Sequence, residues 1–367
     1  MKSKNKKKIV YVILNGEAYG GSEKHVADLI NNISDEEYEK NLIYSINNKM
    51  VEKINNKNIK ECIAINRSIM NLKDILIAII KIKPDIIHLH AARAIFMGRI
   101  ATYIYKFLFK MNVKLVVTSH GLWLPDNKNN FIYKFFMHFM KKNDDITIAV
   151  SEKSKRELVE IGYNPKKLVR IYNGIDFKEF DKYRNVKEQL KEVAFVGRFT
   201  EQKGIGILLE AIKRDNNSFN FMIYGEGELE KDIEKYINSN KLKNVKLYGY
   251  SNNVGEVFNK IDLLLAPSID EGLPYTLVEA MNCGVPIIAT NVGGVSEIVH
   301  NNENGLVIES NSVDELVKAL HSIKKFDVAK LSKKSILISE RFSITNMIDE
   351  VEKVYKIVLG QKEKHFE

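Results

Sequence analysis

The chain has 367 residues, of which 45% are hydrophobic and 28% are charged. This composition excludes an intrinsically disordered protein, and the length predicts two domains of about 150–200 residues each. Two cysteines, Cys62 and Cys283, are too few for a disulfide framework or a cysteine metal cluster. They indicate a reducing cytoplasm.

The net charge of +9 is distributed unevenly along the chain. Residues 1–175 hold 30 Lys and Arg against 17 Asp and Glu, whereas residues 176–367 hold 26 against 30. The basic first half indicates nucleic acid, an anionic membrane, or a lysine-rich composition with no partner. No segment has the roughly 20 apolar residues of a membrane-spanning helix. We therefore expect a cytoplasmic protein whose membrane contact would be peripheral, at the inner face of the cell membrane.

The first half alternates β-branched runs with helical stretches. A strand is expected at 7–14, followed by a glycine-rich turn and a helix at 22–33. Further strands are expected at 41–46, 85–90, 114–120 and 145–151, with helices at 72–82 and 131–142. Such alternation is typical of βαβ units in a parallel sheet covered by helices on both faces.

A second alternation begins after a polar linker at 176–192. Strands are expected at 193–197, 219–225, 244–250, 262–268, 285–290 and 305–309, with helices at 206–212, 229–237 and 276–282. We predict an α/β protein of two doubly wound, Rossmann-like domains, 1–175 and 176–342, that face a central cleft. Ligands of such sheets bind at the carboxyl ends of the strands. The last helical stretch, 344–359, fits on either domain.

The most informative motif lies at 262–290. A buried strand leads into a loop, Pro274 suits the first turn of a helix, and Gly284 is a natural helix stop. Backbone N–H groups at the start of this helix form an anion site. Glu271 and Glu279 are suited to accept hydrogen bonds from sugar hydroxyls. In isolation, the same spacing would be a surface carboxylate and a helix carboxylate paired with a lysine.

Three further positions add to this motif. Arg198 and Lys203, in VGRFTEQKG after the first strand of the second half, are placed to clamp a diphosphate, although such a pair is often solvated surface charge. Gly20 and Gly21 lie between a strand and a helix, so their backbone can approach a phosphate. His120 ends a strand, where a lone histidine is usually structural. Neither the ATPase-type phosphate loop nor the dinucleotide fingerprint is present.

Together these segments resemble the retaining, family 4 glycosyltransferases of the GT-B fold. The resemblance covers nearly the whole chain and rests on GGSEKHV, KPDIIHLH, VTSHG, IYNGID, VGRFTEQKG, YGEGELE and EGLPYTLVEAMNCGVP. It implies retaining transfer of a hexosyl or N-acetylhexosaminyl group from a nucleotide-diphosphate donor, most commonly a UDP-sugar. The acceptor would be a glycan, a lipid-linked molecule or a protein, in cell-surface polysaccharide or glycoconjugate synthesis. A C-terminal helix, 343–367, would cross back onto the first domain.

The resemblance also implies roles for individual residues. The catalytic set would be His120, Arg198, Lys203 and Glu271. The donor-binding set would be Gly20, Gly21, Asn173, Arg198, Lys203, Tyr250, Glu271, Gly272, Leu273, Pro274, Tyr275, Thr276 and Glu279. Within them, the two cations bind the diphosphate, Glu279 binds the ribose, Tyr250 packs on the base and His120 lies beside the anomeric carbon. No D-x-D motif occurs, so we expect no metal and no other cofactor, with fixed charges in place of the ion.

Other functions fit parts of this pattern. A sugar-nucleotide epimerase or hydrolase on the same fold would consume donor without an acceptor. A non-catalytic partner subunit of another glycosyltransferase would tend to lack the cleft residues, which are present here. Nucleic-acid binding ranks last, because no nucleic-acid module is recognisable. The segment 131–142, with four phenylalanines and three lysines, is either a core-facing helix or an amphipathic helix on an anionic membrane.

Overall fold

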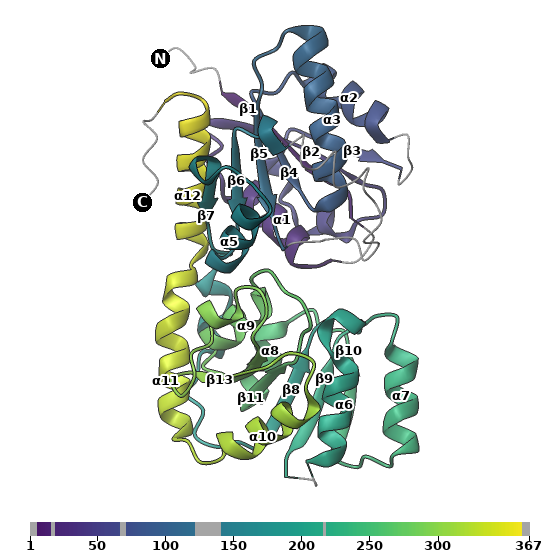
Figure 1. Ribbon diagram of the computed structural model, residues 1–367, viewed down its shortest axis with the longest axis vertical. Helices are drawn as coiled ribbons and strands as arrows, with labels where there is room; N and C mark the ends of the chain where they lie inside the picture. The colour runs from purple at the N-terminus through teal and green to yellow at the C-terminus, as the bar shows by residue number, and fades with distance from the viewer. Residues whose placement is uncertain (1–5, 16–18, 67–70, 122–140, 216–217, 362–367) are drawn as a thin grey trace. The chain divides into compact units, whose positions relative to one another are not determined.

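The protein is described by a computed structural model that covers residues 6–15, 19–66, 71–121, 141–215 and 218–361. It divides into two compact units: unit 1 is Met1–Tyr172 with Met347–Glu367, and unit 2 is Asn173–Asn346. Each unit is a parallel sheet with helices on both faces (Figure 1). The predicted α/β class and the two Rossmann-like domains are confirmed.

Unit 1 contains a seven-stranded parallel sheet in the order β3-β2-β1-β4-β5-β6-β7. The strands are β1 (Lys7–Ile13), β2 (Tyr38–Ser45), β3 (Glu61–Ile65), β4 (Ile86–His90), β5 (Lys114–Ser119), β6 (Ile146–Ala149) and β7 (Leu168–Arg170). Strands β4 and β6 are buried along their whole length, as expected where helices cover both faces of a sheet. The strand order reverses between β1 and β4, and this switch point is where ligands bind such sheets.

Five described helices belong to this sheet: α1 (Gly21–Asn32), α2 (Asn71–Ile82), α3 (Ala92–Phe109), α5 (Glu152–Glu160) and α12 (Ile344–Val358). Residues of α12 from Met347 onward belong to unit 1. There Tyr355 Oη lies 2.7 Å from His88 Nδ1 and 3.3 Å from Tyr11 Oη. The C-terminal helix therefore packs on the first domain. Apart from Lys141 and Lys142, the predicted helix at 131–142 lies outside the described residues.

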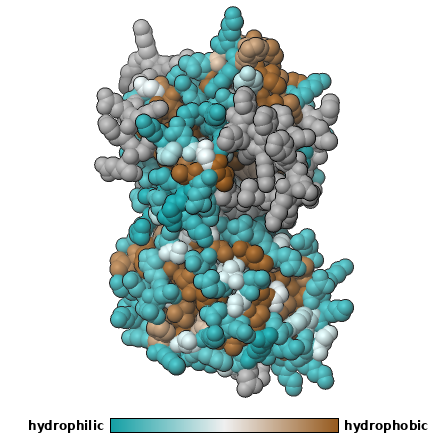
Figure 2. Space-filling view, in the orientation of Figure 1, coloured by the Kyte–Doolittle hydropathy of each residue, from teal (hydrophilic) through white to brown (hydrophobic). Residues whose placement is uncertain are grey.

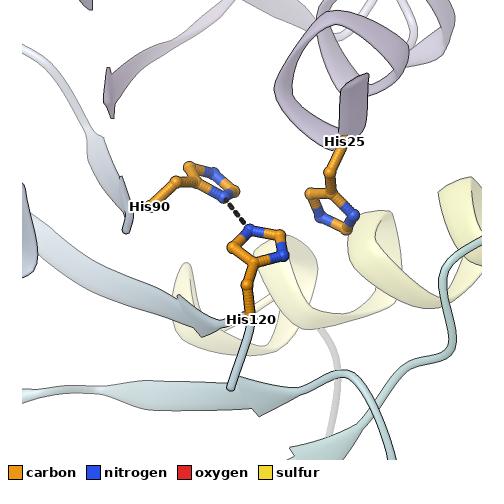
Figure 3. Close-up of side chains that lie close together, drawn as sticks. All are labelled: His25, His90 and His120. Atoms are coloured by element: carbon orange, nitrogen blue, oxygen red, sulfur yellow. Dashed lines mark hydrogen bonds between the residues drawn. The ribbon is translucent and has the colours of Figure 1, made fainter. Parts of the chain in front are cut away.

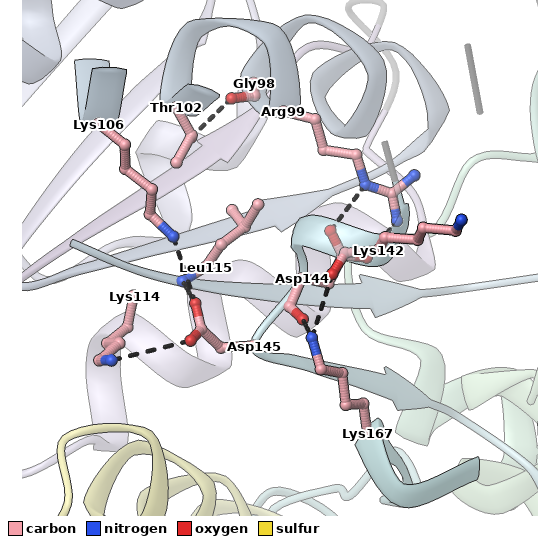
Figure 4. Close-up of polar contacts among 10 residues, drawn as sticks. All are labelled: Gly98, Arg99, Thr102, Lys106, Lys114, Leu115, Lys142, Asp144, Asp145 and Lys167. Atoms are coloured by element: carbon pink, nitrogen blue, oxygen red, sulfur yellow. Dashed lines mark hydrogen bonds and ion pairs between the residues drawn. The ribbon is translucent and has the colours of Figure 1, made fainter. Parts of the chain in front are cut away.

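A buried ion pair joins α3 to the start of β6 (Figure 4). Arg99 Nε donates to Asp144 Oδ1 at 3.0 Å, and a second guanidinium nitrogen donates to Oδ2. Both side chains are 1% exposed. Lys167 Nζ donates to the Asp144 carbonyl oxygen at 2.7 Å. This bidentate geometry compensates for the removal of both charges from water.

Unit 2 contains a six-stranded parallel sheet in the order β10-β9-β8-β11-β12-β13. Its strands are β8 (Glu192–Val196), β9 (Asn220–Tyr224), β10 (Val245–Gly249), β11 (Leu263–Ala266), β12 (Ile287–Thr290) and β13 (Gly305–Ile308). Its helices are α6 (Ile205–Arg214), α7 (Glu230–Ser239), α8 (Val254–Lys260), α9 (Tyr275–Asn282), α10 (Val313–Ile323) and α11 (Val328–Ser339). The order reverses between β8 and β11. Among the described helices of both units, none is both long and apolar enough to cross a membrane.

Candidate active site

Four loops meet at the carboxyl edge of the unit 2 sheet, around the switch point between β8 and β11. They are residues 197–204, 225–229, 267–274 and 291–294. Backbone hydrogen bonds tie them together, from Phe199 N to Glu226 O at 2.9 Å, from Ile269 N to Gln202 O at 2.8 Å and from Gly294 N to Gly272 O at 2.6 Å. The site is therefore one interlocked structure rather than separate loops.

Two glycines make this close packing possible. Gly204 has a φ of +68°, and a Cβ there would lie 1.9 Å from the carbonyl oxygen of Pro267. Gly293 has a φ of +49°, and its Cβ would lie 1.9 Å from the carbonyl oxygen of Glu271. Only glycine fits either position. Gly293 was not predicted from the sequence, although a Gly-Gly pair three residues after a predicted strand is the signal that could have identified it.

This packing brings Lys203 and Glu271 into contact. Lys203 Nζ donates to Glu271 Oε1 at 2.5 Å, and Ser268 Oγ donates to the same oxygen at 2.8 Å. The Lys203 and Glu271 side chains are only 19% and 12% exposed. Arg198 lies in the same loop as Lys203 and is exposed to solvent. A cation and a carboxylate that were predicted to contact different parts of one donor are thus paired with each other.

Helix α9 provides an uncapped N-terminus in the same loop cluster. Its N-cap is Pro274, which makes no side-chain capping hydrogen bond. The helix ends before Gly284, whose φ is +79°, as the sequence predicted. Asn173 Nδ2 donates to the Leu273 carbonyl oxygen at 2.8 Å and so fixes the approach to the helix. Glu279 lies in the second turn and is 7% exposed. The positive end of the helix dipole remains available to an anion.

The other predicted donor residues of unit 2 divide into two groups. Gly272, Leu273, Tyr275 and Thr276 belong to the loop and first turn of α9, beside Glu271. Tyr250 is exposed and follows β10, which is the edge strand of the sheet. Strand β9 separates β10 from β8, so Tyr250 lies at the margin of the loop cluster rather than within it.

On unit 1, Gly20 and Gly21 form the start of α1, next to the switch point. Gly20 is the N-cap, and its N–H donates to Glu23 Oε2 at 3.2 Å. Asn15 Nδ2 donates to the other Glu23 oxygen at 2.6 Å. The helix start thus already holds a carboxylate, which the sequence analysis missed. The signal is a glutamate three residues after the N-cap, the acidic position of a capping box.

His120 is one of three clustered histidines in unit 1 (Figure 3). His25 comes from α1, His90 ends β4 and His120 directly follows β5. His90 Nδ1 lies 3.3 Å from His120 Nε2. Burial, reinforced by the neighbouring histidines, lowers the pKa of both His90 and His120 well below the usual value. Both rings are therefore neutral at pH 7, and His120 can accept or donate a hydrogen bond without carrying charge.

The backbone beside this cluster is strained. Ala91, which follows His90, has φ 66° and ψ 148°, a combination that residues with a Cβ rarely adopt. Such outliers persist only where the surrounding structure enforces them, and they concentrate at functional sites. The strain lies at the carboxyl end of β4, which borders the switch point.

Two family models together match most of the chain. "Glycosyltransferase Family 4" matches residues 19–179, and "Glycosyl transferases group 1" matches residues 176–356. "Uncharacterized glycosyltransferase MJ1178" of Methanocaldococcus jannaschii is 34% identical over 251 residues, which are 67% of this chain and 69% of that protein. The chain belongs to the group 1, family 4 glycosyltransferases.

Two further similarities accompany this assignment. The glycosyltransferase is 29% identical over 320 residues to "UDP-Gal:alpha-D-GlcNAc-diphosphoundecaprenol alpha-1,3-galactosyltransferase" of Escherichia coli, across 79% of this chain and 81% of that one. It superposes on Anabaena Alr3699/HepE, solved in complex with UDP-glucose, with a TM-score of 0.80 at 18% identity, over 95% of this chain and 99% of the other. The predicted GT-B fold, family and enzyme class are confirmed.

Proposed function

We propose that the glycosyltransferase moves a hexosyl or N-acetylhexosaminyl group from a UDP-sugar to a lipid-linked acceptor in cell-surface polysaccharide synthesis, with retention of configuration and without a metal ion. The observation that carries the proposal is the loop cluster of unit 2, which gathers Arg198, the Lys203–Glu271 pair and the start of α9 at the switch point. The Escherichia coli relative is named for a UDP-galactose donor and the Anabaena structure was solved with UDP-glucose, which supports the UDP donor.

The reaction breaks the bond between the anomeric carbon and the diphosphate oxygen, and that oxygen keeps the electron pair. The acceptor hydroxyl forms the new bond to the anomeric carbon on the same face of the sugar. Its proton passes to the departing phosphate. Negative charge therefore grows on the diphosphate, where Arg198, Lys203 and the N-terminus of α9 would stabilise it.

The remaining residues have supporting roles in this proposal. Glu279 accepts hydrogen bonds from the ribose hydroxyls, and Glu271 accepts from hydroxyls of the transferred sugar. On unit 1, the backbone at Gly20 and Gly21 binds phosphate, and the neutral ring of His120 contacts the donor sugar. The absence of a D-x-D motif from the sequence supports fixed cations, rather than an ion, as the source of charge stabilisation.

Donor binding and transfer test this proposal separately. UDP at 100 times its dissociation constant should stabilise the protein by about 2.7 kcal/mol, which a thermal-shift assay detects. Transfer from UDP-galactose to a synthetic GlcNAc-diphosphate lipid should continue in EDTA. Arg198→Ala and Lys203→Ala should each lower turnover about 10²–10³-fold, whereas Lys330→Ala, a change at an exposed lysine of α11, should not.

Three outcomes would contradict the proposal. Activity that EDTA abolishes and magnesium restores would exclude the metal-free mechanism. Consumption of UDP-sugar without any acceptor would favour an epimerase or hydrolase. A β-linked product from an α-linked donor, seen by NMR, would exclude retention.

A lipid-linked acceptor requires contact with a membrane, and the end of α3 offers a surface for it. Tyr103, Phe107, Leu108, Phe109 and Met111 are all exposed there. Figure 2 shows hydrophobic surface at this end of unit 1. We call these five residues the α3 apolar end. Two lysines lie among these residues in the chain, Lys106 on the helix and Lys110 directly after it. Apolar side chains beside lysines suit the interface of an anionic bilayer.

Co-sedimentation with phosphatidylserine-containing vesicles tests this contact. Phe107→Asp should reduce binding, because Phe107 is 72% exposed and a carboxylate is repelled by anionic lipid. Leu337→Asp is the matched control, since Leu337 is 56% exposed on α11 of unit 2. Equal vesicle binding by both variants and the unmodified protein would remove the α3 apolar end from the proposal.

A further inference from the structure

Three histidines of unit 1 bring their ring nitrogens together. The candidate ligand nitrogens of His25, His90 and His120 all lie within 4.8 Å of one another. The rings converge from α1, β4 and the residue after β5 (Figure 3). One pair, His90 Nδ1 and His120 Nε2, is 3.3 Å apart. We propose that these three histidines bind one divalent transition-metal ion of the zinc class.

The spacing suits a tetrahedral ion. Two nitrogens that each lie about 2.0–2.1 Å from zinc are about 3.3–3.4 Å apart at the tetrahedral angle. The His90–His120 pair already has this separation. The ligand nitrogens are nowhere more than 4.8 Å apart, so His25 would have to approach by at most about 1.5 Å to reach the same spacing. Three imidazoles leave a fourth position for water, as in catalytic His₃ zinc sites.

The chemistry of the cluster selects the kind of ion. Neutral imidazole favours zinc, copper or nickel over magnesium or calcium, which prefer oxygen ligands. Among the described residues, the cluster consists of three histidines and contains no carboxylate. His120 is partly exposed, which gives the ion a route in.

A closed hydrogen-bond network within the core is the alternative explanation. In that case the buried ring nitrogens would be satisfied by neighbouring side chains. His90 is fully buried, yet its Nε2 has no hydrogen-bond partner among the residues that the structure describes. Buried polar groups without a partner commonly mark a bound water, an ion or a catalytic role. The described side chains therefore do not close a hydrogen-bond network around His90: Nδ1 makes the 3.3 Å contact to His120, and Nε2 is left without a partner among them.

Metal binding would affect transfer, and this consequence rests on the proposed function. An ion held by His120 Nε2 would bind the ring that is proposed to contact the donor sugar. Zinc should therefore inhibit the enzyme, whereas magnesium should not. The site would be a point of metal inhibition in an enzyme that needs no metal for catalysis.

Cobalt and zinc titrations of the full chain test the site directly. The protein is prepared without a polyhistidine tag and stripped with chelator. Cobalt should give visible ligand-field absorption that saturates at one ion per chain, and calorimetry with zinc should give the same stoichiometry. His25→Ala and His90→Ala should each weaken zinc binding by at least tenfold, since even the loss of an outer-shell partner costs 10–100-fold. His321→Ala, at an exposed histidine of α10, is the control and should bind as the unmodified protein does.

The outcomes separate the site from the proposed function. No stoichiometric ion in the unmodified protein overturns the site, and this measurement does not depend on any variant folding. Zinc binding that is unchanged in both variants also overturns it. One ion bound with transfer unaffected supports the site but contradicts the role of His120 at the donor sugar.

Discussion

Replacement of Glu271 by glutamine should strengthen the binding of UDP alone. In the structure, Lys203 Nζ is held by Glu271 at 2.5 Å. A diphosphate at this site competes with Glu271 for the ion pair with Lys203. The negative charge of the Glu271 carboxylate also repels the diphosphate. Glutamine is nearly the same size but carries no charge, so Glu271→Gln releases Lys203 for the phosphate.

The size of the effect follows from the burial of the pair. Exposed ion pairs contribute about 0–1 kcal/mol, whereas removal of one partner from a fully buried pair costs about 3–5 kcal/mol. With side chains 19% and 12% exposed, the Lys203–Glu271 pair lies between these limits. We take about 1–2 kcal/mol as its contribution, which corresponds to roughly 5- to 30-fold tighter UDP binding. Transfer should nevertheless fall, because a sugar contact is weakened.

Titration calorimetry with UDP provides the measurement. Glu234→Gln, on the exposed face of α7, removes the same charge away from the loop cluster and serves as the control. In a Lys203→Ala background, Glu271→Gln should give a much smaller gain. If Glu271→Gln binds UDP no more tightly than Glu234→Gln, competition for Lys203 is not part of donor binding.

Four other predictions concern single sites. Glu279→Ala should weaken UDP binding by about 1.5–3 kcal/mol, the value of a hydrogen bond to a charged group, and unchanged affinity in calorimetry would exclude the ribose contact. Asp144→Ala should lower the free energy of unfolding by about 3–5 kcal/mol in urea, because it leaves a buried guanidinium unpaired; a loss below about 1 kcal/mol would mean that the pair is solvated. Ala91→Gly should stabilise the protein by up to about 2 kcal/mol through relief of backbone strain, and destabilisation would show that the strain is absent. Cys62 is exposed, whereas Cys283 is buried and burial raises its pKa to about 12. A thiol reagent at pH 8 should therefore modify one cysteine per folded chain and two per unfolded chain. Modification of two cysteines in the folded protein would refute the burial of Cys283.

The central strands could be predicted from sequence because each is a short apolar run between polar stretches. Strands β3 and β7 were not identified, since β3 is a half-exposed edge strand and β7 has only three residues. Helix α3 was missed because apolar residues occur around most of its circumference, which leaves no clear stripe. Only one side of this helix is buried, and apolar residues such as Phe107 and Leu108 are exposed, so the sequence pattern does not report which side faces the sheet.

The candidate residues could be named from motifs, but their contacts could not. Lys203 and Glu271 meet because Gly204 packs on Pro267 and Gly293 packs on Glu271, which are contacts between segments far apart in the chain. The histidine cluster likewise depends on strand order. It forms because β4 and β5 are neighbours in the sheet and α1 starts beside them, and only His120 had been singled out.

The path of the chain through unit 1 has a consequence for its biosynthesis. The ring of Tyr355 is fully buried and bonds to His88 and Tyr11, so residues of α12 complete a core that β1 and β4 begin more than 250 residues earlier in the chain. Unit 2, formed by one continuous stretch, can fold as it leaves the ribosome. Unit 1 cannot complete its core before α12 is synthesised. A nascent chain stalled before residue 347 would therefore leave the surface that α12 covers exposed to chaperones and proteases.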